Sequence, residues 1–404
     1  MAAYGRWADL ADELLLTITH GYSLEQYVLL RSVCAAWRSA LAFSPAPPLP
    51  SLLVLNDSAS SLLSQRSLHL STDTLDNGNR FTCPGKPHRR NRVVGSSNGW
   101  LAVACDLMGV RPLTVWVFLL NPHTGEEIKL LPPRNARYLR KIVFAPDPKP
   151  QDCTSVAIWD LSEVAYINDC RDTEWTIIDV DHTEQLDLAY DAESGKVYCL
   201  DWCGGVRILH TPCWRMQKPK VERLLARRAS NQASVFAPPY DSICSLTFTK
   251  NLFLYDGSLY QVWQNNSSTA KLHLQAGGRF TMFADEIFVM RYDQSRQPSW
   301  DVVKDLGGCS VFIGKNSPVV VRAEAVPGAR ANCIYWIDWL GLPVVCDMAT
   351  GISAPCVLPY GVCRGSCWYL CDDNVSSIDN NGTKSGYEQT DIEDLKSKAR
   401  LLKI

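Results

Sequence analysis

The sequence predicts a mainly β protein with a small all-α module at its amino terminus. We expect three short helices, then a β-propeller-like domain of about six or seven blades, and then a C-terminal helix. Helical spacing of apolar residues is confined to the two ends of the chain, short β-rich runs recur between them, and 13 tryptophans are spread along the whole length. The predicted parts are the helical module at 1–44, a linker, irregular or first-blade segment at 45–92, the β-domain at 93–375 and the tail at 376–404.

Residues 7–43 have the periodicity of helices. Leu10, Leu14 and Ile18 recur every four residues and form one apolar stripe, and the stretch "LLRSVCAAWRSAL" forms another with Val33 and Trp37. Three helices of this size bury little surface, and so small a domain is marginal unless it is stapled or bound. Four prolines in "SPAPPLPS" then separate the module from the β-domain. We therefore expect the stripes to complete their core against another protein, with packing on the β-domain as the alternative.

The β-domain repeats one plan. Each repeat has a strand, a turn rich in Asp, Asn and Gly, and a returning strand. The turn Asp256-Gly257 is the strongest two-residue hairpin signal. At about 40–50 residues for each blade, this length gives about six blades, or seven if the stretch before residue 93 contributes; two packed sandwiches would show a similar spacing. The clearest repeats are 115–133, 188–202, 252–263 and 343–359.

The last 15 residues, "TDIEDLKSKARLLKI" (390–404), predict a helix. Thr390 and Glu393 form a capping box. We expect the apolar face to dock on the body of the protein, and a free tail that binds a partner is the alternative. That face consists of Ile392, Leu395, Ala399 and Leu402.

Composition limits the partners and the compartment. A net charge of −2 gives no support for binding nucleic acid, no secretory signal opens the chain, and the longest apolar runs are far too short to span a membrane. We therefore expect a cytoplasmic or nuclear protein that binds neither nucleic acid nor membrane.

In such a compartment, the 16 cysteines behave as small apolar residues. Cys363, Cys367 and Cys371 share one face of a strand without a nearby histidine, which favours buried thiols over a zinc site, and we expect no cofactor.

The sequence carries no motif of a common enzyme class: no G-x-S-x-G, no phosphate-binding glycine loop and no H-E-x-x-H. His123 lies in a turn and is interpreted as a solvated loop residue. Asp201 and Cys203 flank Trp202 on one face of a strand, but no histidine is placed to activate the thiol, so we interpret this stretch as a strand end with a packed tryptophan.

Two basic stretches remain. "KPHRRNR" (86–92) is interpreted as a solvated loop, with a nuclear localisation patch as the alternative. Ser230 follows two arginines in a pattern that basophilic kinases accept, and its phosphorylation would add negative charge to a loop.

The amino-terminal segment resembles the F-box, a short module that docks onto the Skp adaptor of cullin–RING ubiquitin ligases. The resemblance covers 7–43 only, and Ala11 stands where the family usually has proline. It implies that Glu13 and Arg38 set the polar register at the rim of the contact. The nine residues expected to bind the adaptor are Leu10, Ala11, Glu13, Leu14, Ile18, Val33, Cys34, Trp37 and Arg38. The matching residues are Leu10, Glu13, Leu14 and Ile18 in the first half and Arg31, Val33, Cys34, Trp37 and Arg38 in the second.

The remainder looks like the C-terminal, kelch-like domain that accompanies F-boxes in a large plant family. The residues that carry the resemblance are "VVGSSNGWLAVA" (93–104), "LLNPHTGEEIKLLPP" (119–133) and the stretch 310–338. The resemblance implies a non-catalytic receptor subunit of a ubiquitin ligase, which binds the adaptor with the F-box and a target protein with the β-domain. A propeller hydrolase or carbohydrate-binding protein with a helical cap is the alternative, and a scaffold that never delivers ubiquitin is a third possibility.

Overall fold

The computed structural model describes most of residues 51–369 and a few positions between 10 and 40. The longest gaps within the first range are 83–89, 107–114, 132–138, 212–218, 225–234 and 357–366. The chain divides into two compact units, one of residues 1–49 with 374–404 and one of residues 50–373. The predicted helix at 390–404, Ser230 and His123 lie outside the described residues.

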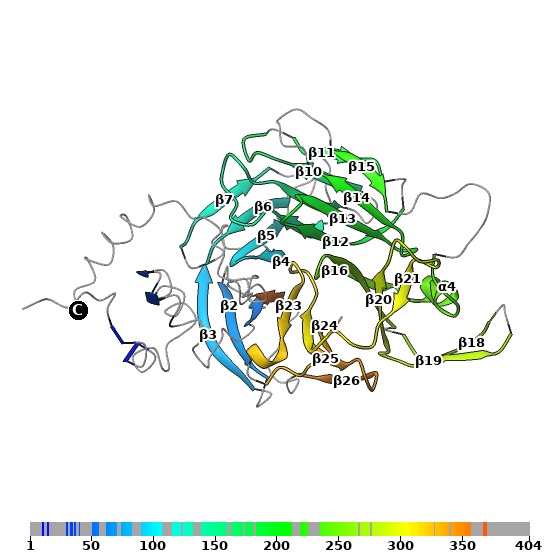
Figure 1. The fold of residues 1–404 in the computed structure, drawn as a ribbon. Coiled ribbons are helices and arrows are strands. Elements are labelled where there is room, and N and C mark those ends of the chain that lie inside the picture. Colours follow the sequence, from blue (N-terminus) through cyan, green and yellow to red (C-terminus); the bar gives the residue numbers. More distant parts are fainter. Residues whose placement is uncertain are drawn as a thin grey trace, which may run out of the picture. The chain divides into compact units, whose positions relative to one another are not determined.

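The larger unit is a mainly β propeller (Figure 1). Its described strands form six sheets of four or five strands and one two-stranded hairpin. The first three sheets, in the order of their strands, are β27 (Cys367–Tyr369), β1 (Ser51–Leu55), β2 (Leu62–His69) and β3 (Thr74–Thr82); β4 (Arg90–Ser97), β5 (Trp100–Asp106), β6 (Val115–Leu120) and β7 (Glu127–Leu130); and β8 (Leu139–Phe144), β9 (Ser155–Trp159), β10 (Glu163–Ile167) and β11 (Thr176–Ile178).

The other sheets follow in chain order. They are β12 (Gln185–Asp191), β13 (Lys196–Asp201), β14 (Val206–His210) and β15 (Lys220–Arg223); β16 (Thr249–Tyr255), β17 (Ser258–Gln264), β20 (Ile287–Tyr292) and β21 (Trp300–Val302); the hairpin β18 (Ala270–His273) and β19 (Arg279–Met282); and β23 (Val319–Arg322), β22 (Cys309–Phe312), β24 (Cys333–Ile337), β25 (Pro343–Asp347) and β26 (Ile352–Pro355). Neighbouring strands are antiparallel except β22 and β24. The described helices of this unit are α4 (Tyr240–Ile243), η2 (Cys244–Leu246) and η3 (Ala323–Ala325).

The hairpins predicted from turn residues are confirmed. Strands β6–β7, β12–β13, β16–β17 and β25–β26 pair within the four predicted repeats. Asp256 and Gly257 have φ angles of 49° and 65°, the left-handed conformation that a two-residue turn between twisted strands requires. In the hairpin after β12, the Gly195 amide donates to the Asp191 carbonyl at 2.9 Å, which closes the turn.

Apolar side chains fill the space between each pair of neighbouring sheets. One cluster joins the β4–β7 sheet to the β8–β11 sheet, and further clusters join each sheet to the next around the unit. The last cluster joins the sheet of β27 and β1–β3 back to that of β4–β7, through Cys367 and Tyr369. The clusters therefore form a closed ring in which every sheet buries both faces, which explains the even spread of tryptophans.

The ring closes because strands from both ends of the unit share one sheet. β1 pairs with β27, and Leu52 lies opposite Trp368. Strands β1, β2 and β3 lie within the stretch 45–92, for which a linker, an irregular segment or a first blade was predicted. The basic stretch 86–92 is likewise not only a loop, since Arg90, Asn91 and Arg92 open β4. The sequence did not identify β1, β2 and β3 as strands because they lack an alternating apolar pattern.

The described residues of the smaller unit include one buried apolar cluster. Leu15, Trp37 and Ala40 are buried together, with Leu10, Leu30 and Cys34 packed against them. Among the positions described here, Leu14, Leu15, Leu30, Val33, Ala36, Trp37 and Ala40 are helical. In the described residues, no helix is long and apolar enough to cross a membrane.

Candidate functional site

A buried ion pair lies where the inner strands of the propeller meet. β27, β4, β8, β12 and β16 each end their sheet, and each contacts the next in this series. From β8, the Lys141 ammonium lies 2.5 Å from the Asp187 carboxylate of β12 and donates to the Gly314 carbonyl at 3.0 Å. Both side chains are almost fully buried, with 4% and 1% of their surface exposed. The pair therefore links three sheets at the centre.

The carboxylate of Asp187 is also held by the strand that follows. Its second oxygen accepts from the Leu252 amide at 2.7 Å and from the Asn251 side chain at 3.3 Å. Burial of a charge is tolerated when a partner and hydrogen bonds replace the lost water. This pair was not predicted, although a lysine inside the apolar run "LRKIVF" and an aspartate inside "QLDLAYD" were its signals.

A second basic group lies beside this pair. Lys315 follows Gly314 in the segment 313–317, and Ser317 of that segment donates to the Ser96 carbonyl at 2.7 Å. The pKa of Lys315 is lowered from its ordinary value, mainly by burial, and further by the positive charge of Arg92. Arg92 opens the inner strand β4 and donates to the Leu139 carbonyl at 3.1 Å. The charge of Arg92 thus disfavours the protonated form of Lys315.

A buried lysine also joins two loops at the junction of the fourth and fifth sheets. Lys250 of β16 donates to the Trp202 and Cys244 carbonyls at 2.8 Å each and to the Thr247 carbonyl. Its pKa is lowered, mainly by burial. The Cys244 thiol donates to the Cys203 carbonyl at 3.0 Å, which adds a second link between the same loops.

Several apolar side chains in or near these two loops are exposed to solvent. Trp202 is 36% exposed, Leu246 36% and Phe248 60%, and Val235, beside the buried Phe236, is 38% exposed. Phe236 contacts the same loops, because a Cβ atom at Gly204 would lie 2.9 Å from its ring. Exposed apolar side chains that gather in one place mark an interaction site. We name the four residues Trp202, Val235, Leu246 and Phe248 the Trp202 surface.

The interpretation of 201–203 as a strand end with a packed tryptophan is corrected in part. β13 does end at Asp201, but Trp202 is exposed. Asp201 is buried and accepts from the Gly205 amide at 2.8 Å, whereas Cys203 is exposed. The two side chains do not share a face, because the chain leaves the strand there and Gly204 turns with a φ angle of 76°. No nucleophilic site results.

The structure describes six of the nine residues expected to bind the adaptor. Leu14 and Val33 are exposed, by 56% and 46%. Trp37 is buried against Leu15, and Leu10 and Cys34 are partly buried beside them. Ala11 is exposed, and its carbonyl accepts hydrogen bonds from the amides of Leu14 and Leu15, which are helical. This helical turn forms although alanine stands where the F-box pattern usually has proline. Glu13, Ile18 and Arg38 lie outside the described residues.

The cysteines of the propeller are mostly buried. Cys367 of the predicted trio is fully buried, and burial raises the pKa of its thiol to about 11, while Cys363 and Cys371 lie outside the described residues. Throughout the described part of the chain, no group of three or more His, Cys, Asp and Glu side chains is placed to hold a metal ion.

Comparison with known proteins shows the family. No curated protein matches the chain. Among solved structures, the apo form of AztD from Citrobacter koseri is similar to 60% of this chain with 8% identity and a TM-score of 0.30, and the chain spans 62% of its length. The family described as KIB1-4 β-propeller matches residues 68–369, about three quarters of the chain. It ends at Tyr369, the last residue of the strand that closes the ring. The chain therefore belongs to the KIB1-4 β-propeller family.

Proposed function

We propose that this protein is the substrate-recognition subunit of an SCF-type cullin–RING ubiquitin ligase, with no catalytic step of its own. The amino-terminal unit binds the Skp adaptor, and the propeller binds a target protein in the cytoplasm or nucleus. The observation that carries the proposal is that, among the few described residues of this unit, the apolar side chains of Leu14 and Val33 are exposed. Apolar side chains in that position gain free energy when a partner covers them.

The core of this unit decides which substitutions are informative. Trp37 and Leu15 pack together, so truncation of either side chain removes the unit's own stability as well as any contact with the adaptor. Leu14 and Val33 lie outside that core, and their replacement by serine leaves it intact. Ala36 is exposed and helical, so Ala36→Ser is a matched control.

The test is co-purification of the full chain with a Skp-type adaptor. Leu14→Ser with Val33→Ser is expected to weaken adaptor binding at least tenfold, since two apolar contacts of about 1–2 kcal/mol each are lost. Ala36→Ser is expected to bind like the unaltered protein. Equal adaptor binding by the double variant and the control, or no binding by the unaltered protein, contradicts the proposal.

We assign target binding to the Trp202 surface. It holds four of the seven large apolar side chains that are exposed in the described part of the propeller unit. Aromatic side chains at the centre of an apolar patch dominate the binding energy of many interfaces. Proximity labelling with the full chain and with Trp202→Ser, Phe248→Ser tests the assignment: target proteins are expected to disappear from the labelled set while the adaptor remains.

We also propose that each sheet of four or five strands is one blade, which would give six. The cluster that joins the last sheet to the first supports this count, because a ring of sheets leaves no open edge between blades. A crystal structure of residues 50–373 tests it directly; five blades or seven would contradict it.

A further inference from the structure

The described strands of the propeller include one hairpin outside the larger sheets. After β17 the chain forms β18 and β19 and then returns to the fifth sheet at β20, which pairs directly with β17. Figure 1 shows the hairpin extending away from the body of the propeller. An insertion into one unit of a repeating fold often lies on the binding face. The hairpin is therefore a candidate for recognition.

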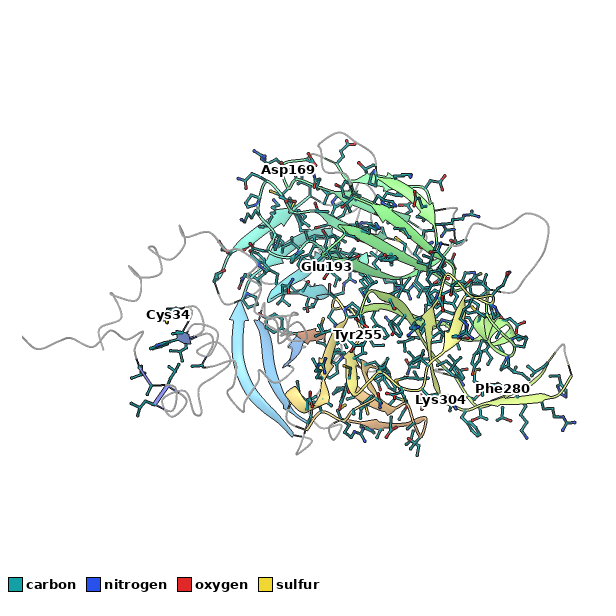
Figure 2. The ribbon with its side chains drawn as sticks, viewed as in Figure 1. Cys34, Asp169, Glu193, Tyr255, Phe280 and Lys304 are labelled. Carbon is teal, nitrogen blue, oxygen red and sulfur yellow. The ribbon has the colours of Figure 1, made fainter. Side chains whose placement is uncertain are left out.

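The two faces of the hairpin differ. One face is apolar and packs into the cluster of the fifth sheet, and its members are Ala270, Leu272, Phe280 and Met282. The ring of Phe280, labelled in Figure 2, lies 6.4 Å from that of Phe288 in β20. Side chains alternate between the two faces of a strand, so the residues between these project from the other face.

The other face is basic. Lys271 lies opposite Thr281, and residues opposite one another share a face. His273 lies opposite Arg279 in the same way. Lys271, His273 and Arg279 are all exposed, and residues 270–282 contain no Asp or Glu. Within the described part of the chain, none of these three side chains has a carboxylate within ion-pair distance.

An exposed aromatic residue continues this face. Phe283 follows β19 directly, and 59% of its surface is exposed. Its amide donates to the Glu286 carboxylate at 2.8 Å, and its carbonyl accepts from the Asn265 side chain at 2.6 Å. The Ser353 hydroxyl of β26 donates to the Asp285 carbonyl at 2.9 Å, which ties the same turn to the neighbouring sheet. These bonds fix the backbone from which the ring of Phe283 projects.

We propose that this face, which consists of Lys271, His273, Arg279 and Phe283, binds an acidic segment of the target polypeptide. We name these four residues the hairpin face. The inference rests on the proposed function, in which the propeller binds a target protein. It names the chemistry that the target must carry, which is a run of carboxylates around an apolar side chain. Opposite charge guides such a segment to the face, and the aromatic ring gives it an apolar anchor.

The amount of charge favours a polypeptide over other anionic partners. Basic patches that hold a protein on anionic lipid contain about four to eight Lys and Arg side chains. The hairpin face has two of these and one His. The net charge of the chain, −2, gives no electrostatic footprint for nucleic acid. So small a positive charge matches a short run of Asp or Glu.

Aromatic packing connects the hairpin to one loop of the Trp202 surface. The ring of Tyr240 in α4 lies 5.6 Å from that of Phe288, which in turn contacts Phe280 of the hairpin. Through η2, α4 leads into the loop that carries Phe248. One cluster of aromatic rings therefore supports both the hairpin and this loop.

The test measures binding of two peptides to the full chain by calorimetry, both acetylated at the amino end and amidated at the carboxyl end. Glu-Glu-Leu-Glu-Glu is expected to bind saturably, and Gln-Gln-Leu-Gln-Gln at least tenfold more weakly. Lys271→Gln with Arg279→Gln is expected to lower the affinity for the acidic peptide at least tenfold. Lys149→Gln with Lys304→Gln is the matched control, because it removes the same charge at exposed positions outside the hairpin; Lys304 is labelled in Figure 2. This control is expected to bind like the unaltered protein.

A second variant tests the aromatic anchor separately. Phe283→Ser is expected to lower the affinity for Glu-Glu-Leu-Glu-Glu several-fold and to leave that for Glu-Glu-Ala-Glu-Glu nearly unchanged, because only the leucine gains from contact with the ring. An equal loss for both peptides would contradict the role of Phe283 as an apolar anchor.

Three outcomes overturn the proposal. They are no saturable binding of the acidic peptide, an equal loss of affinity in the two double variants, and binding to vesicles of phosphatidylserine and phosphatidylcholine in equal parts without binding of the peptide. The second would show that net charge alone acts, and the third would assign the face to a membrane.

Adaptor binding separates this proposal from the proposed function. Lys271→Gln with Arg279→Gln is expected to co-purify with the adaptor like the unaltered protein. Failure of the peptide experiment while adaptor binding is intact contradicts this inference alone. Failure of the adaptor experiment while the peptide binds contradicts the assigned ligase role and leaves the hairpin face as a binding site.

Discussion

The Lys141 ammonium and the Asp187 carboxylate lie 2.5 Å apart at the centre of the propeller, both shielded from solvent. Asp187 also accepts from the backbone of β16, and Lys141 from β8 donates to the Gly314 carbonyl. The pair therefore connects four of the sheets through polar contacts, while the clusters between sheets are apolar. Such a pair aligns the sheets because its hydrogen bonds are directional, which apolar contacts are not.

Removal of one member of this pair is expected to be costly. Lys141→Met leaves the Asp187 carboxylate buried without its counter-charge and is expected to lower the free energy of unfolding by about 3–5 kcal/mol. Urea unfolding of the full chain measures this. Arg140→Gln is the matched control on the same strand, since its partner Glu184 is exposed, and it is expected to cost no more than about 1 kcal/mol. Similar costs for the two variants would show that the buried pair is not a structural link.

Lys250 is expected to hold the Trp202 surface together. Lys250→Met leaves three backbone carbonyls without their donor and is expected to cost about 2–3 kcal/mol. Hydrogen exchange is expected to rise in 201–205 and 244–248 and to stay unchanged in β9 and β10. Lys271→Met, at an exposed position of β18, serves as the control. Unchanged exchange in both loops would contradict the assigned role.

Gly95 is expected to tolerate no side chain. A Cβ atom there would lie 2.2 Å from the Ile142 carbonyl oxygen of the neighbouring inner strand. Backbone cannot move aside as a side chain can, so Gly95→Ala is expected to cost about 3 kcal/mol or to prevent folding. Gly257→Asn, in an open turn where asparagine adopts the required positive φ, is expected to change stability by only about 0.5 kcal/mol. Thermal unfolding distinguishes the two.

The lowered pKa of Lys315 predicts a pH dependence. The folded protein loses this proton at a lower pH than the unfolded chain, whose lysine titrates near its ordinary value of 10.5. Between these two values the unfolded chain binds more protons, so this group makes the free energy of unfolding rise with pH. Lys315→Met has no group that titrates at this position, so it lacks this rise. The difference by which its free energy of unfolding exceeds that of the unaltered protein is expected to be largest near pH 7 and to shrink toward about pH 10 in urea unfolding. An advantage independent of pH would contradict the prediction.

The sequence identified the hairpins and left the strands of the first sheet, β2 and β3, undecided. Turns such as Asp256-Gly257 are local, because positive φ angles favour glycine and aspartate whatever surrounds them. The strands at 62–82 escaped because their apolar content is low, and only pairing within the sheet of β1 and β27 places them. The exposure of Trp202 was not predicted either. Whether a tryptophan at a strand end is buried or exposed depends on which loops lie beside it in the folded protein.

By itself, the sequence determined the β class of the larger unit, the turns between its strands and the apolar stripes of the amino-terminal helices. Periodicity and turn chemistry depend on residues a few positions apart, so these features are written locally. Only the tertiary structure decided that Trp37 faces inward while Leu14 and Val33 stay exposed, and that Lys141 meets Asp187. These contacts join residues tens to hundreds of positions apart, and closure of the ring brings them together.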